Sequence, residues 1–385
     1  MALKDKFAVV GLGITKQGRI PGVSSNGLYV EAINMALEDS GVSRHDINGF
    51  VYQQTGIGGA GFATGDVPRN AGLTDCRFIW AMQTGGVTAT ATVQAACALL
   101  ESGAANYVII GYSSTALSQK VLVGGSAAER STPGTWGHFG PGADHALAAR
   151  RHMHLYGTTH RQMGAIAVNQ RDNANKRPDA MMYGRPMTLE DHANSRIISE
   201  PLHMFDFCLV SDGACAIIIT TAERAKTHKK PPVYIMGLGF GHQVMTGFRK
   251  EQYTTLEVAP SKAAAFKEAG VDVKDIDVAE LYDCFTITVL LELEDYGFCR
   301  KGEGGPFIES GAIKVGGQIP VNTSGNELSW GYMQGYTALC EGIKQMRGEG
   351  GGTQVKDAEV CLVSGHGGTG TGSMQYAHGT CVLRR

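Results

Sequence analysis

Nine cysteines are the most reactive side chains of the 385-residue chain, and their spacing limits the chemistry that they can support. No two of them form a CxxC pair, so the sequence indicates neither a disulfide framework nor a zinc ribbon. We therefore expect reduced cysteines that pack as small apolar side chains.

A second group of candidates lies in a His- and Arg-rich stretch that contains HFGPGAD, Arg150, Arg151, His152 and His154. No set of His, Cys and carboxylate side chains has the closed spacing of a zinc site, so we expect no metal. Gly11 and Gly13 begin a GxGxxG-like pattern, but Lys16 occupies the position of the third glycine. The nucleotide-binding fingerprint is therefore incomplete.

Composition excludes several kinds of partner. A net charge of -2, from 34 basic and 36 acidic residues, gives no global field that would attract nucleic acid or an anionic membrane. The N-terminal sequence MALKDKFAVVGLGIT lacks the features of a secretory signal. No apolar run reaches the roughly 18 to 20 residues that span a bilayer. We predict a cytoplasmic protein.

The elements that must position any site occur twice along the chain. The apolar run AVVGLGIT (8–15) is repeated as VYIMGLGFG (233–241), and each reads as a buried strand. A helix, a glycine and a further strand follow in both copies, as ALEDSGVSRHDINGFVY (36–52) and AFKEAGVDVKDIDVAELY (265–282). Gly41 and Gly270 fall where a helix end favours a left-handed residue.

Later elements continue the repeat and give the domain organisation. Helices are predicted over 88–100 and 333–346, and apolar strands follow over 106–112 and 358–365. Strands that alternate with helices indicate an α/β fold. We predict two similar α/β halves, 1–230 and 231–385. An insertion of about 113–201 in the first half either carries ligand contacts or is a solvated surface subdomain.

Four motifs occur in family order along these halves: AMQTGG (81–86), AELYDCF (279–285), VNTSGNELSWGYMQG (321–335) and SGHGGTG (364–370). Together they resemble the thiolase superfamily, and especially its branch of sterol-carrier-protein thiolases and thiolase-like aldolases of steroid side-chain degradation. The resemblance implies duplicated thiolase-like halves, layered α-β-α-β-α, with a loop and helical insertion in the first half.

The same alignment shows which groups are replaced. Met82 occupies the position of the nucleophilic cysteine, Ser364 that of the second cysteine, and Tyr282 and Tyr332 those of the two histidines. Thiolysis needs a thiolate, a histidine that activates it and a second thiol that moves a proton. A thioether cannot ionise or form an acyl thioester, so we do not expect thiolysis.

The two tyrosines fit a different reaction. A phenol with a pKa of about 10 donates a proton readily, and accepts one at neutral pH only if its surroundings lower that pKa. Retro-aldol cleavage of a β-hydroxyacyl-CoA fits these groups, because it needs no covalent intermediate. The resemblance implies this reaction, with Tyr282 and Tyr332 as the acid/base pair. We favour Tyr282 as the base and Tyr332 as the proton donor.

The thioester enolate of such a reaction needs hydrogen-bond donors. Candidates are the backbone N–H groups of residues 364–368 and the imidazole of His366, which interrupts the glycine run. We expect Gly365, Gly367 and Gly368 to contact the coenzyme A part of the substrate. Asp283 either orients a neighbouring group or ends a strand.

Partners and alternatives follow from the same resemblance. It implies a homodimer, a separate small partner with an OB-fold and a zinc-ribbon element, and no cofactor beyond the coenzyme A of the substrate. The substrate would be a bulky acyl-CoA of the steroid side-chain type, and a product such as propionyl-CoA would be released. Two alternatives remain open: a non-catalytic subunit that binds acyl-CoA or lipid, and an atypical thiolase that uses Cys284 or Cys361.

Overall fold

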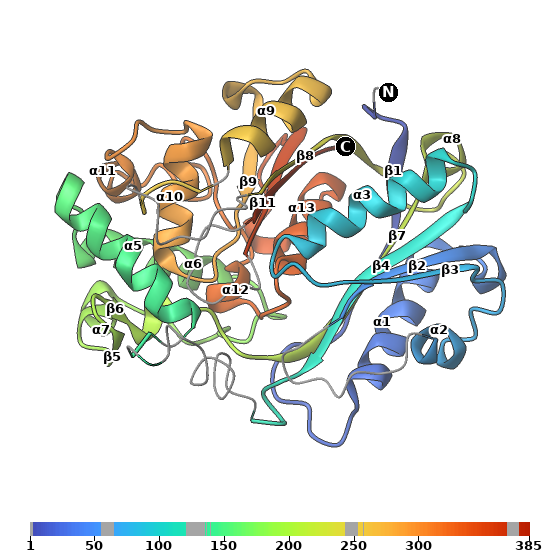
Figure 1. Ribbon diagram of the computed structural model, residues 1–385, viewed down its shortest axis with the longest axis horizontal. Helices are drawn as coiled ribbons and strands as arrows, with labels where there is room; N and C mark the ends of the chain where they lie inside the picture. Colours follow the sequence, from blue (N-terminus) through green and yellow to red (C-terminus); the bar gives the residue numbers. More distant parts are fainter. Residues whose placement is uncertain are drawn as a thin grey trace.

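The protein is described by a computed structural model over residues 3–54, 65–120, 135, 137–138, 140–242, 253–256, 258–367 and 377–385. One large mixed sheet crosses the molecule (Figure 1). Its strands are β1 (Phe7–Ile14), β2 (Ile47–Gln53), β3 (Phe78–Met82), β4 (Tyr107–Thr115), β7 (Asp212–Thr221), β8 (Val233–His242), β9 (Val278–Glu280), β10 (Val360–Gly367) and β11 (Ala377–Arg384).

The order of the strands contains the duplication that the sequence predicts. The sheet runs β3-β2-β4-β7-β1-β8-β11-β10-β9. Read outward from the centre, β1-β7-β4-β2 in the first half corresponds to β8-β11-β10-β9 in the second. Within the sheet, β1 and β8 link the two halves through two antiparallel pairs, Ala8 with Tyr234 and Val9 with Val233.

The helix that follows the first strand of each half ends in the same way. Helix α1 (Ser25–Ser40) ends at Gly41, which has φ 73°, and α9 (Val258–Ala269) ends at Gly270, which has φ 69°. Each glycine donates its N–H to a carbonyl of the last helical turn, at 2.8 Å. A side chain would be strained at this left-handed backbone, so glycine ends both helices.

Helices cover both faces of the sheet and fill the space between its halves. Helix α3 (Thr88–Glu101) and α13 (Tyr336–Arg347) pack in the middle, against β4 and β10 respectively. Helix α1 covers the outer face of the first half, and α9 covers that of the second. Along β1, Val9 points into the central core, whereas Ala8 and Val10 point into the outer core under α1. This alternation shows that both faces of the strand are buried.

The predicted elements are confirmed with small shifts in their bounds. Helix α13 begins at Tyr336, three residues after the predicted start, because Gly335 at φ 92° precedes it as the N-cap. Strand β4 continues to Thr115, and β7 begins only at Asp212. The connection between these strands is therefore 116–211, which is longer at its C-terminal end than the predicted insertion.

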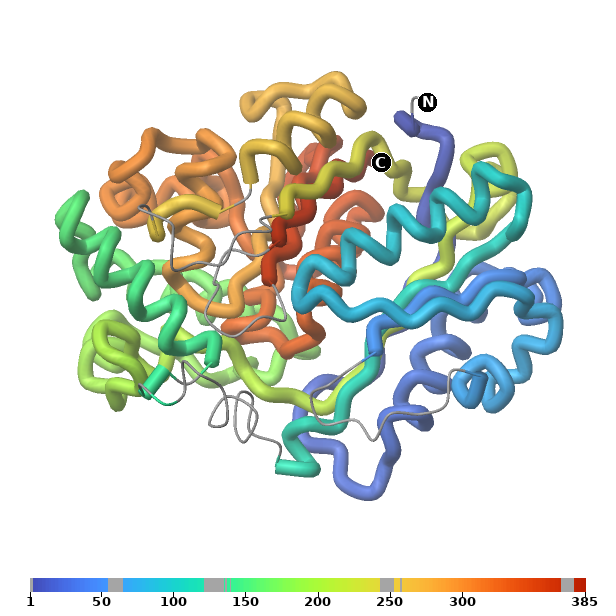
Figure 2. Tube along the Cα trace, viewed as in Figure 1, coloured from blue at the N-terminus to red at the C-terminus, as the bar shows by residue number. Residues whose placement is uncertain are grey.

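This insertion contains α5 (Pro141–Tyr156), α6 (His160–Ala174), α7 (Leu189–Ala193), β5 (Ile197–Ser199) and β6 (Leu202–His203). It packs against α10 (Thr286–Tyr296) and α11 (Gly304–Glu309) of the second half, as the green and orange segments of Figure 2 show. The remaining short helices are α2 (Asp66–Asn70), α8 (Ala222–Ala225) and α12 (Asn326–Ser329). Across the part of the chain that is described, none of the helices is long and apolar enough to cross a membrane.

Candidate active site

Tyr282 lies two residues after β9, and hydrogen bonds to the backbone of Leu281 and of Tyr282 itself fix this segment. The preceding residue, Leu281, donates its N–H to Asn322 Oδ1 at 2.7 Å and accepts from Asn326 Nδ2 at 2.9 Å. The Tyr282 N–H donates to Ser364 Oγ at 2.8 Å. Only 4% of the residue is exposed, so the position of its ring is fixed by packing.

The Tyr282 ring lies directly against the loop that precedes α3. A Cβ atom added to Gly86 would meet Cε2 of the ring at 2.3 Å, so only glycine fits there. Gly86 comes four residues after Met82, the residue at the nucleophile position. The structure therefore brings the AMQTGG and AELYDCF motifs, which lie about 200 residues apart in the sequence, into direct contact.

Ser364 supports Tyr282 from β10. Its hydroxyl accepts the Tyr282 N–H and donates to Glu292 Oε2 at 2.5 Å. Ser364 is fully buried. The residue at the second cysteine position is thus a link between Tyr282 and α10.

Tyr332 follows α12 and is held by Ser211, the residue before β7. The Tyr332 N–H donates to Ser211 Oγ at 2.9 Å, and Ser211 Oγ donates to the Tyr332 carbonyl at 3.0 Å. Burial raises the pKa of Tyr282 well above its ordinary value, and the Tyr332 phenol raises it further. The structure therefore places Tyr332 near enough to Tyr282 for its phenol to raise the pKa of Tyr282.

Burial keeps both phenols protonated in the free site. Burial raises the pKa of Tyr332 as well, and Cys208 and Glu327 add to this effect. A phenol whose pKa lies above 10 stays protonated at neutral pH. The predicted role of Tyr332 as proton donor requires a protonated phenol. A base role for Tyr282 needs a further group that takes its proton.

His366 lies beside Tyr282 as part of a group of three buried histidines. Its ring centroid is 6.4 Å from that of Tyr282, 6.2 Å from that of His145 and 5.9 Å from that of His378. Burial and the nearby His366 lower the pKa of His145 to about 3, and they also lower the pKa of His378. His145 and His378 are therefore neutral at physiological pH.

Glycines of β10 line the opposite side of the Gly86 loop. A Cβ atom on Gly365 would lie 2.6 Å from the Gly86 carbonyl oxygen, and one on Gly367 would lie 2.9 Å from the Gly86 nitrogen. The two predicted glycines are thus packed next to the tyrosine site. Gly368 lies outside the described residues.

The two cysteines of the atypical-thiolase alternative are poor nucleophiles. Cys361 is fully buried on β10, and burial raises its pKa well above the ordinary value. Cys284 Sγ lies 3.6 Å from His145 Nε2 and from Thr288 Oγ1. Burial raises the pKa of Cys284 too, so the group is a thiol and not a thiolate. Its packing role agrees with the sequence interpretation.

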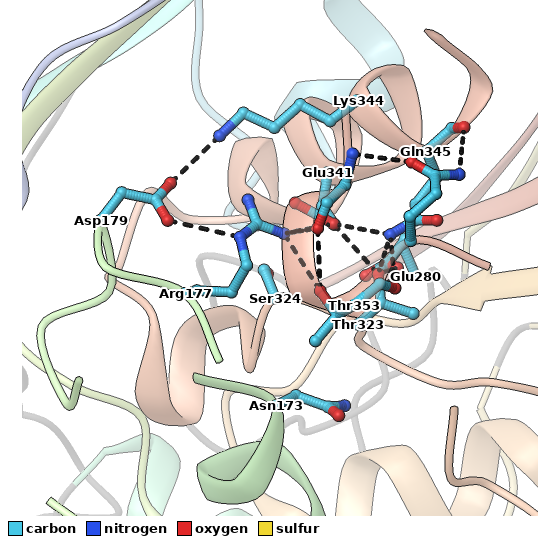
Figure 3. Close-up of polar contacts among 12 residues, drawn as sticks. Asn173, Arg177, Asp179, Glu280, Thr323, Ser324, Glu341, Lys344, Gln345 and Thr353 are labelled. Carbon is cyan, nitrogen blue, oxygen red and sulfur yellow. Dashed lines mark hydrogen bonds and ion pairs between the residues drawn. The ribbon is translucent and has the colours of Figure 1, made fainter. Parts of the chain in front are cut away.

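A buried polar network lies next to β9 (Figure 3). It fixes the loop that carries Asn322, and Asn322 binds the backbone of Leu281 beside Tyr282. Glu280, the last residue of β9, accepts the Thr323 hydroxyl at 2.6 Å. Arg177 Nη1 donates to Glu341 Oε1 of α13 at 2.8 Å, and Arg177 Nε pairs with Asp179. This network ties the end of α6 to β9, to α13 and to the loop that carries Asn322.

Three residues of the site were not singled out from the sequence. Glu327 is 1% exposed, and its charge acts on both phenols. His145 stacks on Phe285 with ring centroids 3.9 Å apart. His378 pairs with His366 across β10 and β11. The signal for His145 was the His-rich composition of the insertion, which does not identify a residue, and the signal for Glu327 was its place inside the motif VNTSGNELSWGYMQG. Among the described residues, no group of three or more His, Cys, Asp or Glu side chains could hold a metal ion.

A duplicated, layered α/β fold with methionine at the nucleophile position and tyrosines at both histidine positions defines a thiolase-fold enzyme without the groups for thiolysis. Residues 239–384 match the family described as thiolase C-terminal domain-like. The 17-hydroxy-3-oxo-4-pregnene-20-carboxyl-CoA lyase of Mycobacterium tuberculosis is 36% identical, over 90% of this chain and 92% of its own length. A steroid side-chain-cleaving aldolase of Thermomonospora curvata is 33% identical, over 90% and 91%.

Solved structures agree with these relatives. The structure named Ltp2-ChsH2(DUF35) aldolase is 32% identical, covers 100% of this chain and 99% of its own, and has a TM-score of 0.88. Human mitochondrial 3-ketoacyl-CoA thiolase in complex with CoA has a TM-score of 0.74 at 15% identity, over 100% and 99%, a likeness of fold alone. The chain belongs to the thiolase superfamily, in the branch of steroid side-chain-cleaving aldolases. It is a carbon–carbon lyase of the aldolase type, and the sequence prediction is confirmed.

Proposed function

We propose that this enzyme cleaves a bulky β-hydroxyacyl-CoA of the steroid side-chain type into a ketone and a short acyl-CoA such as propionyl-CoA. The observation that carries the proposal is the pair of coupled tyrosines, Tyr282 and Tyr332, in a site without a thiolate. Two phenols can move the two protons of a retro-aldol reaction, which needs no acyl-enzyme.

In this reaction the ionised form of Tyr282 takes the proton of the β-hydroxyl first, and the phenol that forms returns this proton to Tyr332 at the end of the cycle. The bond between the α and β carbons then breaks, so that the β carbon becomes a ketone and the α carbon becomes part of a thioester enolate. Tyr332 donates its proton to the α carbon. His366 and the backbone of Gly365 and Gly367 supply hydrogen-bond donors for the enolate oxygen and contacts for coenzyme A.

An apolar cavity next to this site supports a bulky tail. Its volume is about 320 Å³, and its lining includes Met182, Met187, Met204, Phe205 and Phe207. Phe207 packs edge-on against Phe285, three residues after Tyr282, with ring centroids 4.8 Å apart. Met-rich and aromatic walls suit a rigid hydrocarbon skeleton.

We further propose that a small partner protein completes the coenzyme A site, and that the chain forms a homodimer in the cytoplasm. The structure named Ltp2-ChsH2(DUF35) aldolase pairs two components in its name, which supports the first part. Nine free cysteines suit a reducing compartment.

The test is a cleavage assay with a steroid-side-chain β-hydroxyacyl-CoA that carries a tertiary hydroxyl. The enzyme is incubated with and without its candidate partner, and ketone and short acyl-CoA are measured by mass spectrometry without added free CoA. We expect both products in equal amounts. Binding of the acyl-CoA without cleavage, in the presence of the partner, would instead support the non-catalytic subunit.

A further inference from the structure

Arg171 is a buried cation that the reaction described above does not use. It lies near the C-terminal end of α6, and only 6% of the residue is exposed. No carboxylate among the described residues pairs with its guanidinium group, and the nearby charge that acts on it is the positive charge of Arg185. A buried charge without a counter-ion costs stability, so its retention indicates that a ligand compensates it.

Three contacts hold the guanidinium group in one orientation. Its Nε donates to Ser329 Oγ of α12 at 3.1 Å, and its Nη1 donates to the carbonyl of Arg185 at 3.1 Å. Its Cζ lies 5.7 Å from the centre of the Phe205 ring. Nη2 has no hydrogen-bond partner among the residues that the structure describes. The nitrogen that is available to a ligand is therefore Nη2.

The guanidinium group lies at the wall of the apolar cavity of about 320 Å³ described above. Arg171, Ser329 and Phe205 all line this cavity. Apart from Arg171 and Ser329, the lining side chains are those of alanine, valine, leucine, methionine, phenylalanine and cysteine. Among the described residues that line the cavity, Arg171 is therefore the one charged group.

The cavity borders the segments that carry both tyrosines. Cys208 lines it, and the Cys208 N–H donates at 3.0 Å to the carbonyl of Cys284, two residues after Tyr282. Ser329 lines it from α12, and Tyr332 follows three residues later. An acyl tail whose β carbon reacts at the tyrosines can therefore extend into this cavity and reach the guanidinium group.

The number of available N–H groups decides which oxygen fits. A carboxylate binds arginine best through two parallel N–H···O bonds from neighbouring nitrogens. Nε and Nη1 of Arg171 already donate inside the protein, so this bidentate arrangement is not available. A hydroxyl group would bring a donor of its own, and Ser329 is the one lining side chain with an oxygen that could accept from it. A ketone oxygen accepts a hydrogen bond without adding a donor.

We propose that Arg171 gives the enzyme specificity for an acyl tail that already carries a ketone. Nη2 donates to the oxygen of this ketone while the hydrocarbon of the tail fills the apolar cavity. This tail ketone is separate from the ketone that cleavage forms at the β carbon. The proposal rests on the proposed function, because its ligand is the tail of the acyl-CoA that is cleaved.

The test compares two β-hydroxyacyl-CoA substrates with the same steroid skeleton, one with a ketone on the terminal ring and one with a methylene group in its place. Cleavage is followed by mass spectrometry with the partner present. We expect the wild type to favour the ketone substrate by at least about 10-fold in kcat/KM, because the methylene tail leaves a buried N–H without an acceptor. In Arg171→Met this preference should disappear. A general loss of structure would lower both rates alike, so the ratio reports the contact itself.

Arg185→Met is the matched control. The Arg185 side chain is exposed and does not line the cavity, and Arg171 binds its backbone carbonyl rather than its side chain. We expect this variant to keep the wild-type preference. A ketone preference that survives in Arg171→Met overturns the proposal, and so does a wild-type enzyme that cleaves both substrates equally well.

A folding defect is separated from a loss of specificity with a second variant. Thermal unfolding should show that Arg171→Met is folded, because an apolar side chain of similar length replaces a buried charge. If it is not folded, Arg171→Gln takes its place. The glutamine amide reaches the position of Nε but not that of Nη2, so the preference should again be lost. A full wild-type preference in Arg171→Gln would contradict the proposal.

Binding of a free steroid separates this proposal from the proposed function. A steroid whose single oxygen is a ketone on the terminal ring is titrated into the wild type and into Arg171→Met by isothermal titration calorimetry. We expect Kd to rise by about 10-fold in the variant. Equal Kd values overturn the role of Arg171, whereas a wild-type enzyme that binds the steroid ketone but cleaves neither acyl-CoA overturns the proposed function instead.

Discussion

The hydroxyl groups of Tyr282 and Tyr332 carry the reaction in the proposed mechanism, whereas their rings are held by packing. We expect Tyr282→Phe and Tyr332→Phe each to lower kcat by at least about 100-fold, because each removes one proton transfer and leaves the ring in place. The measurement is steady-state cleavage of the acyl-CoA with the partner present. Tyr183→Phe, at a tyrosine that is 51% exposed, is the control. Two active phenylalanine variants would refute the assignment.

The lowered pKa of His145 leads to a separate prediction about how the stability of the protein depends on pH. In the folded protein its pKa is about 3, compared with 6.5 for an exposed histidine. The unfolded chain therefore binds a proton below about pH 6.5 that the folded protein does not bind until about pH 3, so stability is lost as the pH falls through this window. Between pH 6.5 and 5 the loss amounts to about 2 kcal/mol.

Urea unfolding of His145→Gln at pH 6.5 and pH 5 tests this expectation. The variant should lose about 2 kcal/mol less than the wild type on acidification, because glutamine does not titrate. His154→Gln, at an exposed position of the same helix, should behave as the wild type does. Equal losses in all three proteins would show that His145 is already protonated in the fold.

At the scale of elements, the buried polar network of Figure 3 holds the C-terminal end of α6, β9 and α13 together. Arg177 is 4% exposed and Glu341 is 3% exposed. Removal of the only arginine drawn in this network leaves buried carboxylates without compensation. We expect Arg177→Ala to lower the free energy of unfolding by about 3 to 5 kcal/mol.

Urea unfolding measures this change. Arg161→Ala is the comparison, because the Arg161 side chain is 70% exposed and its pair with Glu309 should contribute no more than about 1 kcal/mol. A loss in Arg177→Ala as small as that of the control would mean that the network does not hold these elements together.

At the scale of the whole molecule, β3 is an edge strand with a row of backbone groups that the sheet leaves unpaired. Trp80 is 44% exposed on this strand, and β3 ends at Met82 beside the active-site loop. An exposed edge with a large apolar side chain favours pairing with a second copy.

Multi-angle light scattering tests the proposed homodimer at this edge. The wild type should have the mass of two chains, and Trp80→Lys should shift it toward one, because a charged side chain on the edge disfavours pairing. Tyr183→Lys, an exposed aromatic residue outside the sheet, should remain dimeric. A dimer that persists in Trp80→Lys would place the interface elsewhere.

The sequence alone determined the fold class and the replaced catalytic positions. Glycines at helix ends and apolar runs are local signals, so Gly41 and Gly270 predict the same helix end in both halves. The motif register likewise identified Tyr282 and Tyr332. Side-chain chemistry then excluded thiolysis, because a thioether at Met82 cannot ionise in any fold.

Only the tertiary structure decided which groups surround these tyrosines. His145 reaches the site through contacts between segments far apart in the sequence, and Glu327 lies inside the motif that carries Tyr332 but has no feature there that marks it as buried. Their proton affinities depend on burial and on neighbouring charges, which exist only after the chain has folded. The sequence therefore identified the two phenols, and the fold raised their pKa values and placed the buried Glu327 carboxyl group near enough to act on both.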